Sequence, residues 1–87
     1  MVRLTGHMEL PLARREAVLA ALPDHIRLTR AEPGCLRFDV KEGDGRLDIS
    51  EDFLDDAAFA AHQARIRGTA WEAVTAGLAR DYAVETV

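Results

Sequence analysis

The sequence predicts an α+β fold in which one antiparallel sheet carries helices on a single face. Residues 2–10, 36–41 and 46–53 alternate apolar and polar side chains, as strands with one buried face do. Only a Glu-Gly-Asp-Gly turn separates the last two runs, so they are antiparallel neighbours. Residues 12–31 and 55–78 have helical spacing, and a short alternating segment closes the chain. The order strand, helix, strand, strand, helix, strand is the ferredoxin-like arrangement.

The alternation also assigns the strand residues to the two faces of the sheet. Toward the helices we expect Val2, Leu4, Gly6, Met8, Leu36, Phe38, Val40, Leu47, Ile49, Glu51 and Phe53. Toward the other face we expect Thr5, His7, Arg37, Asp39, Asp48 and Ser50. Because this second face is polar, it would stand in solvent or meet its own copy across a two-fold axis.

The first helical region divides at a proline. An amphipathic helix is expected over residues 12–22. Pro23 is unfavourable inside a helix but suits a first turn, so we expect a kink or a second short helix up to about residue 31. His25 would then be exposed. Pro33 ends the region, because it disfavours helical backbone at the preceding residue.

The second helical region begins at an aspartate, residue 55 or 56, which caps it. Its inward stripe carries Phe59, His62 and Ile66. Gly68 and Thr69 interrupt the helix, and a second segment that contains Trp71 resumes the apolar stripe. In the closing strand, Tyr82 and Val84 fall on one face.

Size and charge exclude several classes of protein. Residues 1–87 make a single domain near the lower end of what folds alone, so association of copies would supplement its core. The net charge of -4 does not favour binding to nucleic acid or to an anionic membrane, because both attract basic surfaces. No apolar run suits a membrane span or a signal peptide, so we expect a cytoplasmic protein.

Cys35 is the only cysteine, so no internal disulfide can form. Without a nearby cysteine or spaced histidines it does not suggest a zinc site. A small strand residue is the favoured interpretation, and a catalytic thiol is the alternative.

A carboxylate and an imidazole are both expected in the interior. Glu51 shares its strand face with apolar residues, and His62 lies on the buried stripe of the following helix. Both groups are costly to bury unless they are paired. We therefore expect them to face each other across a candidate site, with a purely structural hydrogen-bonded pair as the alternative.

The chain resembles a known family at these same positions. The Glu-Pro-Gly-Cys turn at 32–35, Phe38, the run 49–53 and His62 followed by Trp71 resemble the antibiotic biosynthesis monooxygenase family, over nearly the whole chain. The resemblance implies a homodimer whose two sheets pack face to face as a dimeric α+β barrel. It also implies oxidation of a small aromatic phenol or quinol by dioxygen, with no metal and no flavin or other cofactor.

The resemblance further implies roles for particular residues. His62 would be the base or hydrogen-bond donor, and Glu51 would orient it. An apolar lining that holds a flat aromatic substrate and excludes water would consist of Phe38, Phe53, Phe59, Ile66 and Trp71. The same lining residues have an alternative interpretation as ordinary core.

Three functions therefore stay open. The first is a cofactor-independent monooxygenase. The second is a non-catalytic dimeric module that binds a small hydrophobic ligand or accompanies an enzyme. The third is an isomerase that uses the same acid/base pair without oxygen.

Overall fold

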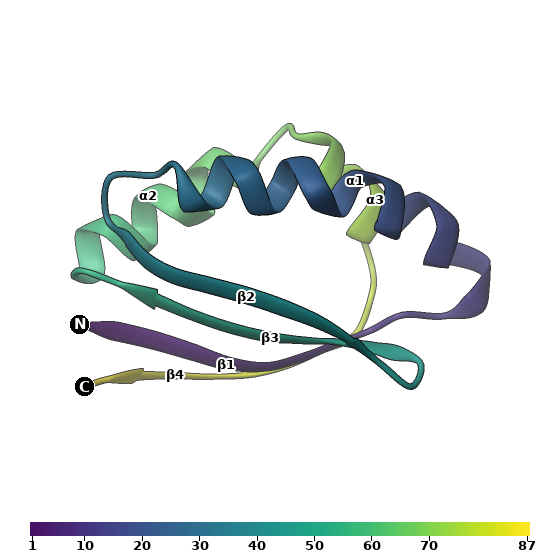
Figure 1. Cartoon of the computed structure of the whole chain (residues 1–87), viewed down its shortest axis with the longest axis horizontal. Helices are drawn as coiled ribbons and strands as arrows, with labels where there is room; N and C mark the ends of the chain where they lie inside the picture. The colour runs from purple at the N-terminus through teal and green to yellow at the C-terminus, as the bar shows by residue number, and fades with distance from the viewer.

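The structure is a computed structural model that describes all of residues 1–87. Four strands form one antiparallel sheet in the order β2-β3-β1-β4, and three helices cover one of its faces (Figure 1). In chain order the elements are β1 (Val2–Glu9), α1 (Leu12–Arg30), β2 (Cys35–Gly43), β3 (Arg46–Phe53), α2 (Asp56–Ile66), α3 (Ala70–Thr75) and β4 (Arg80–Thr86). The predicted ferredoxin-like arrangement is confirmed.

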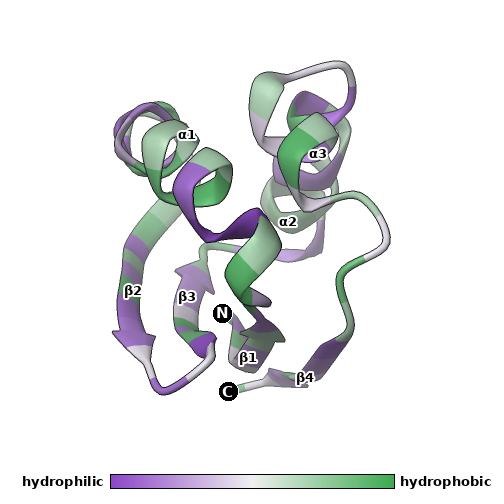
Figure 2. Cartoon of the chain, turned by 90° about the vertical axis from the view of Figure 1, so that its right-hand side faces the viewer, coloured by the Kyte–Doolittle hydropathy of each residue, from purple (hydrophilic) through white to green (hydrophobic).

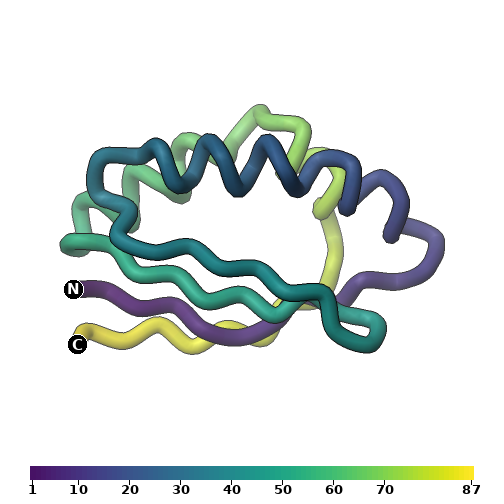
Figure 3. The backbone as a smooth tube through the Cα atoms, in the orientation of Figure 1, coloured from purple at the N-terminus to yellow at the C-terminus, as the bar shows by residue number.

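The helical layer has two halves, seen when the molecule is viewed from its end (Figure 2). α1 lies on the side of β2, and α2 and α3 lie on the other side. The two chain ends lie together at one end of the sheet (Figure 3), where the amino group of Met1 donates to the Val87 carbonyl at 3.2 Å. None of the helices is long and apolar enough to cross a membrane.

The core lies between the sheet and the helices, on the face that the alternation predicts. Leu4, Met8 and Leu47 from the central strands pack with Val18 of α1, and all four are buried. Glu51 lies directly opposite Leu4 in the register of β3 with β1, so it shares this inner face and is 4% exposed. The sheet therefore carries one carboxylate into an otherwise apolar layer.

The prediction that Leu36 faces inward is wrong. Cys35 pairs with Phe53 and Arg37 pairs with Asp52, so Leu36 is an extra residue without a partner across the strands. Such a β-bulge interrupts the alternation of side chains. Leu36 is accordingly 56% exposed, while Phe38, beyond the bulge, is buried.

The second short helix that was one of the two expectations at Pro23 does not form, because α1 is one helix from Leu12 to Arg30 with Pro23 inside it. A continuous helix places Val18, His25 and Thr29 on the same face, since they are spaced by seven and four residues. All three are buried, and His25 is 4% exposed. The prediction of an exposed His25 is therefore wrong, because it assumed that the helix restarts at the proline.

The interruption of the second helical region is confirmed. The Asp55 side chain accepts a hydrogen bond from the Ala58 amide at 2.8 Å and caps α2. After α2, Gly68 has a positive φ of 79°, and Thr69 caps α3 by accepting from the Glu72 amide at 3.3 Å. Two caps in succession thus set the faces that α2 and α3 turn toward the sheet.

The outer face of the sheet is polar, as predicted. Arg3 and Arg37 donate to opposite oxygens of Asp52 at 2.8 and 3.0 Å, and Arg37 also donates to Ser50 at 2.6 Å. The hydrogen bond from Arg3 is the largest cause that lowers the pKa of Asp52 to about 2. This face therefore carries an ion-pair network centred on one buried carboxylate.

Candidate functional site

His62 is enclosed between α2 and the sheet. The cap at Asp55 fixes where α2 begins, and His62 is the buried residue of that helix, with 2% exposure. Its ring packs against the ring of Phe53, with 4.8 Å between the centroids. The prediction that His62 faces inward is confirmed.

The hydrogen-bond partner of His62 is Glu32, which the sequence analysis treated only as the end of a helix. His62 Nδ1 lies 2.9 Å from Glu32 Oε1. An ionised carboxylate can only accept, so Nδ1 carries the hydrogen and the lone pair is on Nε2. Arg65 donates to the other oxygen of Glu32 and, at 2.9 Å, to the hydroxyl of Thr29. A partly buried network therefore fixes the orientation of the imidazole.

Glu51 lies on the opposite side of the His62 ring. Its Oε2 atom is 3.7 Å from His62 Nε2, which is an ion-pair distance but too long for a hydrogen bond. Burial, and secondly the charge of Glu32, raise the pKa of Glu51 to about 7. Burial also lowers the pKa of His62, against the raising effect of its hydrogen bond to Glu32. A neutral imidazole thus faces a carboxyl group that keeps its proton to a much higher pH than an exposed glutamic acid does.

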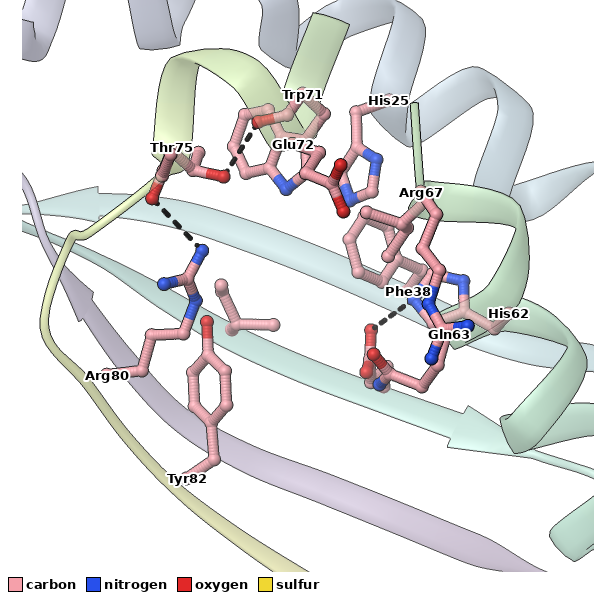
Figure 4. A pocket seen from close by; sticks show the side chains of 14 residues that line it. His25, Phe38, His62, Gln63, Arg67, Trp71, Glu72, Thr75, Arg80 and Tyr82 are labelled. Atoms are coloured by element: carbon pink, nitrogen blue, oxygen red, sulfur yellow. Dashed lines mark hydrogen bonds and ion pairs between the residues drawn. The ribbon is translucent and has the colours of Figure 1, made fainter. Parts of the chain in front are cut away.

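A cavity of about 410 Å³ opens beside this pair (Figure 4). Its lining consists of His25, Phe38, Ile49, Glu51, His62, Gln63, Ile66, Arg67, Trp71, Glu72, Thr75, Ala76, Arg80 and Tyr82. Five of the residues proposed from the sequence are among them: Phe38, Glu51, His62, Ile66 and Trp71. The volume lies within the range of small-molecule sites.

Two residues proposed as lining are not part of it. Phe53 is fully buried, and its ring centroid lies 5.7 Å from that of Phe59. Both side chains lie outside the cavity lining, and Phe53 contacts the His62 ring. Phe53 and Phe59 therefore do not line this cavity as proposed, because Phe53 packs between the His62 ring and Phe59.

The other nine lining residues were not proposed from the sequence, and His25, Arg80 and Tyr82 are among them. His25 stacks on Trp71 with 4.4 Å between ring centroids and an interplanar angle of 4°. Arg80 is held by the Leu78 and Thr75 carbonyls at 2.8 and 3.2 Å. Tyr82, on the same strand, is half-buried, and burial raises its pKa. His25 could have been found from its spacing to Val18, had α1 been read through the proline.

Comparison with known proteins agrees with this architecture. The family model of antibiotic biosynthesis monooxygenases matches residues 1–74. The chain belongs to the antibiotic biosynthesis monooxygenase family. No curated protein sequence matches it closely enough to be named as a relative.

Solved structures of similar fold include a candidate antibiotic biosynthesis monooxygenase from Nitrosomonas europaea. It is 19% identical with a TM-score of 0.85, over 100% of this chain and 98% of that one. Rv0793 from Mycobacterium tuberculosis is 22% identical with a TM-score of 0.79, over 99% of this chain and 93% of that one. At these identities the structures establish the fold, while membership of the monooxygenase family supports a general monooxygenase-like function.

The raised pKa of Glu51 in this family member predicts a pH-dependent stability. Because the folded chain holds the Glu51 proton to about pH 7 and a free carboxyl loses it near 4.5, the folded state binds more protons between these values. As the pH rises through this window, the free energy of unfolding of the parent should fall relative to that of Glu51→Gln by roughly 3 kcal/mol. The histidines, whose pKa values are lowered by burial, contribute equally to both proteins and cancel in this difference. Urea titrations from pH 4 to 8 measure it, with Glu16→Gln, on the exposed side of α1, as the control. Parallel pH profiles for parent and Glu51→Gln would contradict the prediction.

Substitution of Glu32 should change both partners of the pair. In Glu32→Gln the pKa of His62 should fall further, and the pKa of Glu51 should also fall, because the Glu32 charge raises both. Loss of the charged partner of Arg65 should lower the free energy of unfolding by about 1–3 kcal/mol. NMR titration of the His62 ring and the Glu51 carboxyl measures the shifts, and Glu72→Gln, exposed at the cavity rim, is the control. Unchanged pKa values would refute the assigned network.

Proposed function

We propose that this protein is a monooxygenase that oxidises a small aromatic phenol or quinol with dioxygen, without a metal or flavin cofactor. The observation that carries the proposal is the position of His62 and Glu51 in the wall of a 410 Å³ cavity. Family membership over residues 1–74 supports the monooxygenase part of it. The aromatic substrate and the use of dioxygen are what the resemblance to this family implies.

Proton transfer is the step that the site residues would perform. The bare Nε2 of His62 faces the cavity side of the ring and would take the phenolic proton of the substrate. Glu51, when ionised, would stabilise the resulting imidazolium at a distance of 3.7 Å. Glu32 holds the ring through Nδ1, so the base keeps one orientation.

The electrons would come from the substrate itself. A phenolate is electron-rich and can reduce dioxygen, with one oxygen atom forming a new carbon–oxygen bond and the other leaving as water. Conversion of a phenol to a quinone in this way uses one molecule of dioxygen. The phenolic hydrogen, one ring hydrogen and the second oxygen atom form the water molecule that is released. The step is therefore balanced without an external reductant.

The apolar part of the wall would protect the reactive intermediates. Phe38 and Trp71 are 3% and 8% exposed and form flat surfaces suited to an aromatic ring. Ile66 extends this surface from α2. Displacement of water by the substrate would strengthen the electrostatic effect of Glu51 on His62.

Oxygen uptake tests the proposed function. With a panel of hydroquinones and anthrone, the parent protein should consume dioxygen, and His62→Ala should lower kcat by about 100-fold or more, as loss of a general base does. Glu16→Ala, on the exposed side of α1, is the control. Absence of uptake above background for every substrate would refute the proposal. Substrate turnover without oxygen would instead favour an isomerase, and a loss of stability in His62→Ala without any turnover would favour a binding module.

We also propose that the protein is a homodimer that pairs through the outer faces of two sheets. That face carries no helix, and it holds the network of Arg3, Arg37 and Asp52 in place of an apolar layer. Sedimentation equilibrium should give twice the chain mass of 9.6 kDa. A mass of one chain at micromolar concentration would refute the proposal.

A further inference from the structure

His25 is the one buried polar side chain whose bonding the site described above does not explain. The residue is only 4% exposed, and its Nδ1 atom is enclosed without a hydrogen-bond partner. It is the only buried side-chain nitrogen or oxygen in the chain with this property. An unpaired polar atom in the interior costs free energy, and it restricts which of the two ring nitrogens carries the hydrogen.

The other ring nitrogen, Nε2, is not enclosed in this way, and His25 lines the cavity. The indole N–H of Trp71, stacked on the same ring, also has no protein partner and is not enclosed. Figure 4 shows the rings of His25 and Trp71 side by side below the helices that carry them, each with a nitrogen on the edge toward the cavity. Two polar edges of a rigid stack therefore meet the cavity at one place.

The charge and tautomer of His25 follow from its surroundings. Burial, then the charges of His62 and Arg65, lower its pKa to about 3, so the ring is neutral at working pH. A neutral imidazole carries one hydrogen. A buried N–H group without an acceptor is rarer in proteins than a buried acceptor without a donor. We therefore assign the hydrogen of His25 to Nε2 and a lone pair to the enclosed Nδ1. Two neutral N–H donors, from His25 and Trp71, then face the cavity.

We propose that the stacked pair of His25 and Trp71 binds a carbonyl oxygen of the ligand, so that this cavity prefers phenols that also carry a ring carbonyl. The inference deepens the proposed function and relies on it for the assignment of the cavity as a substrate site. Two convergent donors suit an oxygen acceptor and give no hydrogen bond to a hydrocarbon edge. His25 would be a binding residue and not a base, because its proton affinity is too low. The base and the donor pair lie close together, with 6.2 Å between the centroids of His62 and His25.

The test compares 1-tetralone with tetralin, which share a bicyclic frame and differ in the carbonyl oxygen. The parent protein should bind 1-tetralone about tenfold more tightly, since one or two hydrogen bonds to neutral donors contribute about 1 kcal/mol each. In His25→Phe, which keeps a flat ring against Trp71, this preference should fall to threefold or less. Arg27→Phe, at an exposed position of the same helix, is the matched control and should keep the full preference. Neither ligand needs dioxygen, so the result does not depend on turnover.

A second measurement uses the parent protein alone, in case His25→Phe does not fold. In protein labelled with ¹⁵N at histidine, the His25 signals should show hydrogen on Nε2, and 1-tetralone but not tetralin should shift the Nε2 resonance. Hydrogen on Nδ1, equal binding of the two ligands, or an unchanged preference in His25→Phe would overturn the proposal. If oxygen uptake fails while the ketone preference holds, the proposed monooxygenase activity is wrong and the carbonyl site stands.

Discussion

The hydrogen bond between Glu32 and His62 is the contact on which the cavity depends. A ring with 2% exposure needs a partner, and Glu32 supplies it from the segment that follows α1. The same carboxylate binds Arg65, so one side chain connects the end of α1 to two successive turns of α2. Because Nδ1 donates to Glu32, the ring is held with the lone pair of Nε2 toward Glu51 and the cavity. The bond thus sets the tautomer, the ring orientation and the position of the helix together.

The sequence predicts the fold well and the site only in part, for identifiable reasons. Strand alternation and helical spacing are local properties, so the inward positions of Glu51 and His62 follow from the residues around them. Partners that lie far apart in the chain do not follow in this way. Glu32 and His62 are separated by 30 positions, and no pattern in either segment predicts that the two side chains meet. Leu36 was misplaced because a β-bulge shifts the alternation, and a bulge depends on how two strands pair.

The environments of His62 and His25 give the same kind of side chain two different pKa values. His62 keeps a charged hydrogen-bond partner, which offsets part of the cost of burial and preserves its capacity to take a proton. His25 has none, and burial leaves it neutral to about pH 3. One residue type thereby provides an acceptor of protons and a fixed neutral donor within a single cavity. Pro23 contributes indirectly, because the helix that continues through it brings His25 to the inner face.

The cavity draws its wall from distant parts of the chain. Glu51 and His62 lie on β3 and α2, while Thr75 ends α3 and Arg80 and Tyr82 lie on β4. β4 is an edge strand that pairs with β1 alone. Substitutions in β4 would therefore alter one wall of the cavity and leave the titrating groups in place.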